Sequence, residues 1–284
     1  MRRVFAGAVA VLLALTGCAG DVDQADPAGQ TAPVTRQAHL GDSFAAGTGL
    51  RPLVADSSFL CQRADGNYGR LVSRGRGTEL TDVSCAGATT EDLTAAQYEG
   101  VGPQLAALDA DTDLVTLTLG GNDAGVFATA VGECTRLGRA EPAGAPCARA
   151  QGQTLLTALD TRTRPALTRG LRAIVERAPS ARVLVVGYPW LLPPTDGCFA
   201  QVPIAAGDVP YLHRLQRRLN AVVAEAAAAT GATYVDVAGP SAAHTACAAD
   251  DQRWIAPLRS GPGSLHPTEL GQRAMADAVL AALD

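Results

Sequence analysis

The stretch HLGDSFAAGTGL, from His39 to Leu50, decides how the rest of the chain is interpreted. It ends an apolar run on Gly-Asp-Ser and continues with small residues, which is typical of a β-strand that runs into a tight turn. Two interpretations of Ser43 follow from this pattern. Either its hydroxyl is a nucleophile at the end of a strand, or Asp42 and Ser43 only cap the turn or helix that comes next.

Similar apolar runs recur along the chain and alternate with segments of helical spacing. The predicted strands are residues 35–40, 80–83, 113–119, 181–187 and 232–237, and the predicted helices are residues 68–74, 150–177 with an interruption at Pro165, 209–229 and 267–283. This alternation predicts an α/β fold, a three-layer α/β/α sandwich around a parallel sheet of about five strands. Ligands of such a sheet bind beyond the carboxyl ends of its strands.

The composition is that of a globular protein with one main domain. The chain has 284 residues, of which 47% are hydrophobic and 18% charged, and it shows no internal repeat. Its net charge is -5, and its 23 basic residues, all arginine, are scattered rather than grouped. A negative chain without a basic block argues against a nucleic-acid partner.

The first eighteen residues, MRRVFAGAVAVLLALTGC, have the layout of an export signal, with two arginines before a short apolar stretch. The letters LTGC resemble a bacterial lipobox, which implies cleavage before Cys18 and attachment of a lipid to its thiol. An ordinary cleaved signal is the alternative. Residues 19–35 lack apolar periodicity and are expected to form a flexible tether, followed by the folded domain at 36–284.

Apart from Cys18, the chain has six cysteines. Because the chain is expected to be exported, this even number predicts three disulfides. Their spacing leaves 15 pairings open, and sequential pairing is one of them. The sequence contains no C-x-x-C and only four isolated histidines, so we expect no metal and no cofactor. The six cysteines are Cys61, Cys85, Cys134, Cys147, Cys198 and Cys247.

Three further motifs carry candidate site residues. LGGNDAG follows the most continuous apolar run and brings Asn122, whose amide can donate to an oxyanion, although an Asn-Asp pair also caps helices. SCAGATT places Gly87 just after a cysteine, where a turn is the simpler interpretation. GSLHPTELGQ places His266 directly before a proline that opens the last helix, which fixes its position in a loop.

Taken together and in this order, the motifs resemble those of the GDSL esterases and lipases, also called SGNH hydrolases, over residues 35–284. The segment GYPWLLPP and the six cysteines look most like the secreted actinobacterial members. The resemblance implies a flavodoxin-like fold with Ser43 as nucleophile and His266 as general base. It also implies an oxyanion hole made by the backbone amides of Ser43 and Gly87 and the side chain of Asn122.

One position departs from the family pattern. Many members have an aspartate three residues before the catalytic histidine, where this chain has Gly263. A main-chain carbonyl of Gly263 or Ser264 is the first candidate to orient His266, and Asp250 or Asp251 is the second. Asp42 and Asp123 are expected to support the loops beside the nucleophile rather than to titrate in the reaction.

The expected protein is a monomeric lipoprotein on the extracellular face of the membrane, or a secreted protein, that hydrolyses lipid or short-chain acyl esters. The alternatives are an acyltransferase on the same fold and a non-catalytic module that binds acyl chains or glycans. Tyr188, Pro189, Leu191 and Leu192 are candidates to line an apolar acyl pocket.

Overall fold

The structure is a computed structural model that describes Met1 and residues 34–258 and 261–284. The predicted signal sequence, the lipidated Cys18 and residues 19–33 of the tether therefore lie outside the described residues, apart from Met1. Residues Val34–Asp284 form one compact unit. Thr35 already belongs to it, because its backbone N–H and its hydroxyl both donate to the Asp113 carboxylate, at 2.8 and 2.7 Å.

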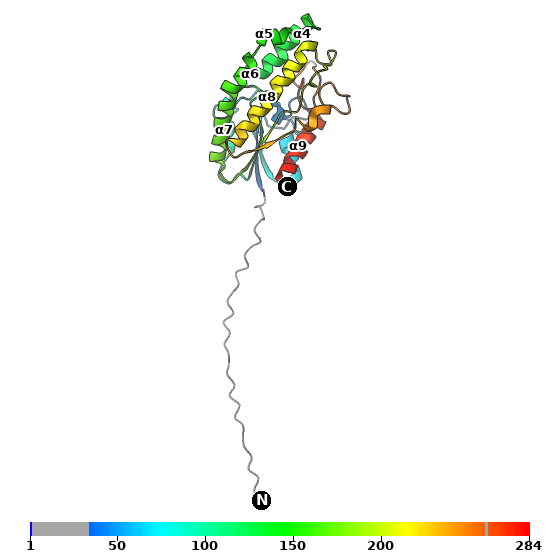
Figure 1. Ribbon diagram of the computed structural model, residues 1–284. Helices are drawn as coiled ribbons and strands as arrows, with labels where there is room; N and C mark the ends of the chain where they lie inside the picture. The colour runs from blue at the N-terminus through cyan, green and yellow to red at the C-terminus, as the bar shows by residue number, and fades with distance from the viewer. Residues whose placement is uncertain (2–33, 259–260) are drawn as a thin grey trace. The chain divides into compact units, whose positions relative to one another are not determined.

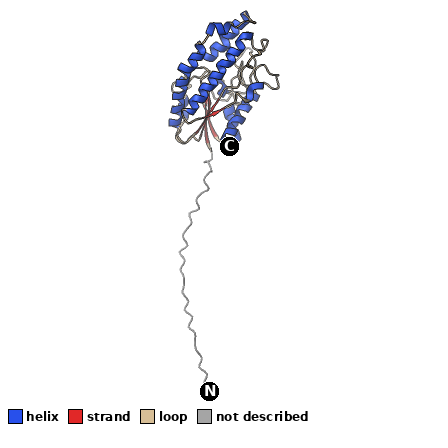
Figure 2. Ribbon diagram, viewed as in Figure 1, coloured by secondary structure: helices blue, strands red, loops and turns tan. Residues whose placement is uncertain are grey.

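Five parallel strands form a single sheet in the order β2-β1-β3-β4-β5. The prediction of five strands is confirmed, with ends that differ by one or two residues. Figure 2 shows these strands between the helices that flank them. The strands are β1 (Arg36–Gly41), β2 (Glu79–Asp82), β3 (Leu114–Thr118), β4 (Arg182–Val186) and β5 (Thr233–Val235).

Helices cover both faces of the sheet, as the alternation of elements predicted (Figure 1). Helices α7 and α8 pack together over one face, and α2 and α9 pack together over the other. The helices are α1 (Ser43–Ala46), α2 (Tyr68–Arg76), α3 (Val126–Ala128), α4 (Cys134–Ala140), α5 (Pro146–Gln151), α6 (Thr154–Ala158), α7 (Arg164–Arg177), α8 (Val209–Ala228) and α9 (Glu269–Leu283).

The long helical segment predicted at 150–177 differs from the prediction in where it breaks. Pro165 does not interrupt a helix but lies in the first turn of α7, directly after another helical turn. The segment breaks earlier, at Gly152, where α5 ends before α6 begins. A π-helical turn at Leu159–Thr163 then joins α6 to α7. The helix therefore keeps its course, and only its hydrogen-bond register changes.

Alternate side chains of each central strand enter two separate cores. Val183 and Val185 of β4 face α7 and α8, whereas Leu184 and Val186 join the core under α2 and α9. This two-sided burial is the reason why the strands of a parallel sheet are almost continuously apolar.

A buried polar group interrupts the second core at His39. One ring nitrogen of His39 lies 3.0 Å from the carbonyl of Ala45, and the other lies 2.8 Å from the Thr116 hydroxyl. Helix α2 passes directly over the imidazole at Gly69, where an added Cβ would lie 2.1 Å from the ring. Glycine is therefore required at position 69 for α2 to reach the sheet.

We predict that Gly69→Ala lowers the free energy of unfolding by about 1–3 kcal/mol, because the methyl group would overpack a buried site. The matched control is Gly75→Ala in the same helix, where an added Cβ makes an ordinary 3.4 Å contact with Leu280. That variant should be neutral or more stable by up to about 1 kcal/mol. Urea denaturation of both proteins measures the difference, and equal stabilities would contradict the prediction.

Candidate active site

The nucleophile candidate lies in a turn that only glycine permits. β1 ends at Gly41, whose φ is +119° and whose missing Cβ would otherwise lie 2.3 Å from the Thr118 carbonyl oxygen. The next residue, Asp42, caps α1 by accepting a 2.9 Å hydrogen bond from the backbone N–H of Phe44. Ser43 is the first residue of α1 and is 7% exposed. Asp42 therefore caps the helix that follows, and at the same time Ser43 lies at the end of a strand.

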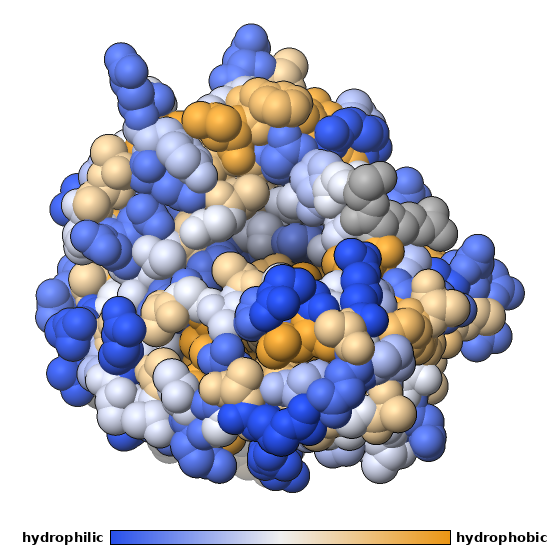
Figure 3. Space-filling model, turned by 90° about the horizontal axis from the view of Figure 1, so that it is seen from above, coloured by the Kyte–Doolittle hydropathy of each residue, from blue (hydrophilic) through white to orange (hydrophobic). Residues whose placement is uncertain are grey.

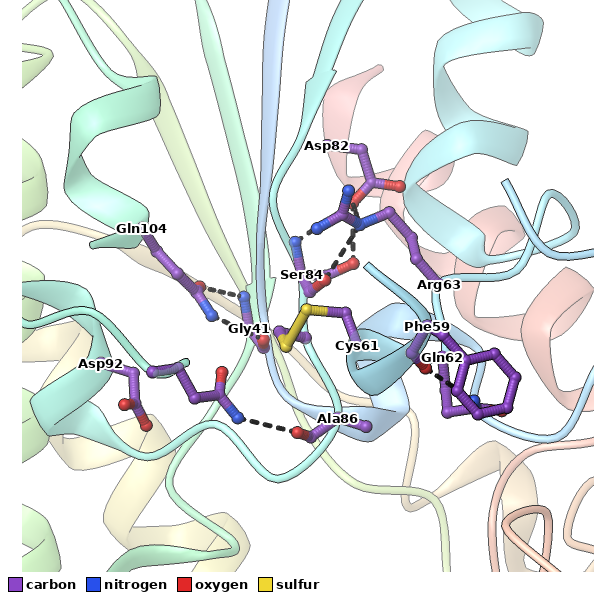
Figure 4. The surroundings of a disulfide bond; sticks show 12 residues. Gly41, Phe59, Cys61, Gln62, Arg63, Asp82, Ser84, Ala86, Asp92 and Gln104 are labelled. Carbon is purple, nitrogen blue, oxygen red and sulfur yellow. Dashed lines mark hydrogen bonds and ion pairs between the residues drawn. A yellow bond between two sulfur atoms is a disulfide. The ribbon is translucent and has the colours of Figure 1, made fainter. Parts of the chain in front are cut away.

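Gln104 and a disulfide hold this turn, as Figure 4 shows. The side chain of Gln104 accepts from the N–H of Gly41 at 2.7 Å and donates to its carbonyl at 3.0 Å. The Cys61–Cys85 disulfide lies beside the same turn, and the N–H of Cys85 donates to the carbonyl of Gly41 at 3.0 Å. The strand end is therefore fixed by backbone and side-chain hydrogen bonds together.

The Gly87 loop follows directly from this disulfide. The N–H of Ala86 donates to the carbonyl of Cys61 at 2.9 Å, and Gln97 donates to the carbonyl of Ala86 at 2.8 Å (Figure 4). Gly87 is exposed and has a φ of +79°. Within residues 34–258 and 261–284, the backbone amides of Gly87 and Ser43 donate to no protein group. Both N–H groups thus remain available to a ligand.

Asn122 and its neighbour connect the end of β3 to the Gly87 loop. The Asn122 amide donates to the carbonyl of Ala88 at 3.0 Å, which occupies one of its two hydrogens. The Asp123 carboxylate accepts from the backbone N–H and the hydroxyl of Thr90, at 2.9 and 2.8 Å. Asp123 therefore supports a loop, and burial raises its pKa.

His266 lies in the loop before α9 and is 8% exposed. Its Nδ1 lies 2.7 Å from the carbonyl oxygen of Ser264, whereas the carbonyl of Gly263 accepts the backbone N–H of His266 at 3.3 Å. A carbonyl can only accept, so Nδ1 carries the hydrogen and Nε2 keeps a free lone pair. Burial lowers the pKa of His266 to about 4, and the Ser264 hydrogen bond opposes that shift.

The second candidate for orienting His266 is engaged elsewhere. Asp250 forms an ion pair with Arg253, three residues along the chain, and Asp251 is exposed. Over the ranges that the structure describes, no carboxylate forms a hydrogen bond with the His266 ring. Of the groups that the sequence offered, the Ser264 carbonyl is the one that contacts Nδ1.

Phe44 brings the serine turn and the histidine loop together. Its ring lies 5.2 Å from the His266 ring between centroids, and its carbonyl accepts from Gln272 of α9 at 2.9 Å. A Cβ on Gly49 would lie 2.3 Å from the Cα of Gly263, so the two loops also touch through their backbones. No hydrogen bond joins Ser43 to His266 in the described part of the chain, and such bonds often form only with substrate.

An apolar pocket lies next to these groups. It is lined by Gly121, beside Asn122, and by Leu265, beside His266, and its other walls include Phe127, Leu191 and Leu192. Figure 3 shows a hollow in the face of the molecule seen from above, with both polar and apolar residues along its edge. Leu191 and Leu192 thus line a pocket as the sequence suggested. Tyr188 and Pro189 do not belong to its lining.

Three residues of the site, Gln104, Phe44 and Phe127, escaped the sequence analysis, and a fourth, Tyr188, was assigned to a pocket wall. Gln104 clamps Gly41, Phe44 and Phe127 pack against the imidazole, and the Tyr188 hydroxyl binds polar groups below the site. Nothing in a single sequence marks a glutamine or an aromatic residue as a partner of a distant loop. Only Tyr188 carried a signal, because it follows β4 at the carboxyl edge of the sheet.

The six cysteines form three disulfides, as predicted, and the structure selects the sequential pairing. The bonds are Cys61–Cys85, Cys134–Cys147 and Cys198–Cys247. In the described ranges no group of three His, Cys, Asp or Glu side chains is arranged to hold a metal ion. The described helices also include none that is long and apolar enough to cross a membrane.

Comparison with known proteins identifies the class. Residues 39–274 match the model of the GDSL-like lipase/acylhydrolase family. Lipase 2 of Streptomyces coelicolor is 44% identical over 98% of this chain and 95% of that protein, and a lipase of Streptomyces rimosus is 33% identical over 82% and 81%. The crystal structure of phospholipase A1 from Streptomyces albidoflavus superimposes with a TM-score of 0.75 at 26% identity, covering 87% of this chain and 99% of that one.

Fold and relatives together define a carboxylic ester hydrolase built on an α/β/α sandwich. The chain belongs to the GDSL-like lipase/acylhydrolase family, as its sequence motifs predicted. It is therefore an enzyme, and the interpretation as a non-catalytic binding module is set aside.

Because burial lowers its pKa to about 4, we expect His266 to stay neutral from pH 7 down to about pH 5. In the unfolded chain a histidine takes up its proton near pH 6.5. The unfolded state thus binds more protons between pH 4 and 6.5, and the contribution of His266 to stability falls as pH drops through that window. An NMR titration of the His266 ring, repeated in urea, measures both values. A folded-state midpoint near 6.5 would contradict the prediction.

Proposed function

We propose that Ser43 and His266 perform acyl transfer from an ester to water. The Ser43 hydroxyl attacks the ester carbonyl while Nε2 of His266 takes its proton, and the imidazolium then gives that proton to the leaving alcohol. Water repeats the sequence on the acyl-enzyme and frees Ser43. The observation that carries this proposal is the buried His266, with Nδ1 held by Ser264 and its ring packed on the residue next to Ser43.

The proposed oxyanion hole uses the three donors that other protein groups leave open. They are the backbone amides of Ser43 and Gly87 and the second hydrogen of the Asn122 amide. Loss of one such donor typically costs about 3–4 kcal/mol of transition-state stabilisation. The disulfide beside Gly87 and the Ala88 carbonyl that binds Asn122 support the geometry before substrate arrives.

The Ser264 carbonyl takes the place of the triad carboxylate in this mechanism. It fixes the tautomer of His266 but supplies only a dipole to the imidazolium. Since His266 is buried and its pKa is about 4, charging the ring is costly in the resting protein. The negative charge that develops on the oxyanion in the same step offsets part of that cost.

Lipid or short-chain acyl esters are the proposed substrates. The apolar pocket beside Gly121 and Leu265 offers space for an acyl chain, and relatives are named lipase and phospholipase A1. Transfer of the acyl group to an acceptor other than water would use the same groups. The ratio of transfer product to free acid distinguishes the two reactions.

We further propose that the enzyme acts outside the cell, as a monomer. Three disulfides fit an oxidising compartment, and the S. rimosus relative of known structure is described as an extracellular lipase. The LTGC segment supports a lipid anchor at Cys18, which would hold the domain at the extracellular face of the membrane.

The first prediction of this mechanism is that Ser43→Ala lowers kcat on p-nitrophenyl acetate by about 10⁴-fold or more, because the nucleophile is removed. The matched control is Ser73→Ala, which removes a buried serine hydroxyl from α2, where it donates to the Thr78 carbonyl. That variant should keep wild-type kcat. Steady-state hydrolysis by residues 34–284 measures both, and an active Ser43→Ala protein would exclude the proposed nucleophile.

A second prediction concerns the acyl chain. Ala130 lines the pocket and Ala128, two residues earlier, is exposed outside it. We expect Ala130→Phe to lower kcat/KM about tenfold or more on p-nitrophenyl decanoate and to leave the acetate ester nearly unchanged, since added volume excludes the longer chain. Ala128→Phe is the control and should affect neither ester. Equal losses on both esters would show that the chain binds elsewhere.

A further inference from the structure

The proposed oxyanion donors come from separate turns that must stay in register. Ser43 follows β1, and Asn122 follows β3. A backbone hydrogen bond, from the N–H of Asp42 to the carbonyl of Thr118 at 2.9 Å, joins the two strand ends directly at this point. Beyond it the chains diverge into α1 and into the Gly120–Asp123 turn.

The Tyr188 hydroxyl lies between these two turns. It donates to Oδ2 of Asp42 at 2.5 Å and accepts from the backbone N–H of Gly121 at 2.8 Å. The other oxygen of Asp42 accepts the N–H of Phe44, as described above. One hydroxyl therefore joins the residue before Ser43 to the residue before Asn122.

Tyr188 is itself rigidly held. It is 3% exposed, and its backbone N–H donates to Asn220 of α8 while its carbonyl accepts from the same side chain, each at 2.9 Å. Its ring packs edge-to-face on Phe44 with 5.0 Å between centroids. Because both its backbone and its ring are fixed, its hydroxyl is a fixed reference point for the two turns.

Gly121 is shaped to receive this hydroxyl. A Cβ on Gly121 would lie 3.0 Å from the Tyr188 oxygen, which is closer than such contacts normally are. Burial also raises the pKa of the Tyr188 hydroxyl well above its usual value, so it keeps its proton. With Gly121 donating to it, the O–H of Tyr188 is directed at Asp42.

We propose that Tyr188 is a positioning residue that holds the Ser43 turn and the Asn122 turn at the separation the oxyanion requires. The inference rests on the proposed oxyanion hole. Tyr188 is not among the residues that line the pocket, so we expect its effect to reach the reaction through these two turns. Its removal should then weaken transition-state stabilisation and leave ester binding in the ground state unchanged.

The direct test is Tyr188→Phe, which keeps the ring on Phe44 and removes only the bridge. We expect kcat on p-nitrophenyl acetate to fall about tenfold or more, with KM within about twofold of wild type. The matched control is Tyr211→Phe on α8, because the Tyr211 hydroxyl is buried and has no hydrogen-bond partner among the residues that the structure describes. That variant should keep wild-type kcat. A Tyr188→Phe protein with unchanged kcat would overturn the proposal.

A double-mutant cycle with Asn122→Ala separates positioning from a general structural effect. If Tyr188 acts by placing Asn122, adding Tyr188→Phe to Asn122→Ala should cost less than about threefold in kcat. Multiplicative losses would overturn the inference. If Tyr188→Phe does not fold, as judged by circular dichroism, Asp42→Ala removes the acceptor of the tyrosine O–H, and the same cycle applies to it.

Failure of the proposed function has a different signature. If Asn122→Ala alone leaves kcat unchanged, the oxyanion hole itself is wrong, whatever Tyr188 does. If Asn122→Ala is impaired but Tyr188→Phe is not, the oxyanion hole stands and only the inference about Tyr188 fails.

Discussion

The close approach of β1 and β3 at Gly41 is the constraint on which the site depends. Without a Cβ at Gly41, the chain passes within van der Waals range of Thr118 and turns at a φ of +119° that L side chains rarely adopt. Asp42 then donates to the Thr118 carbonyl, and α1 begins at Ser43. Ser43 reaches the carboxyl edge of the sheet because Gly41, where β1 approaches β3, has no side chain.

Around Gly41, a small number of polar side chains connect each strand end to the next through hydrogen bonds. Gln104 holds Gly41 from one side, and Asp42 receives Tyr188 from the other. The Cys61–Cys85 disulfide adds a covalent link on the β2 side. Ordering a loop that carries free backbone donors costs conformational entropy. The hydrogen bonds and the disulfide offset this cost when the protein folds, so the loops are already ordered during catalysis.

Burial then sets the charge states of the site. The Asp42 carboxyl has its pKa raised to about 7, chiefly by burial, and its hydrogen bonds to Tyr188 and Phe44 oppose that shift. Burial acts in the opposite sense on the imidazole of His266, whose neutral form is favoured. A base that is uncharged before the reaction needs no carboxylate to keep its Nε2 unprotonated. A carbonyl that fixes the tautomer is enough for that part of its role.

The sequence by itself determined the five strands and the long helices between them, the expectation of three disulfides and the family, because hydrophobic periodicity, cysteine number and short motifs are local properties. The sequence left open how the cysteines pair and which group contacts Nδ1 of His266. It also misplaced the helix irregularity at Pro165 and assigned Tyr188 to a pocket wall. Those features depend on which loops meet in space, and Ser264, Gln104 and Tyr188 acquire their partners only when strand ends far apart in the chain converge at one edge of the sheet.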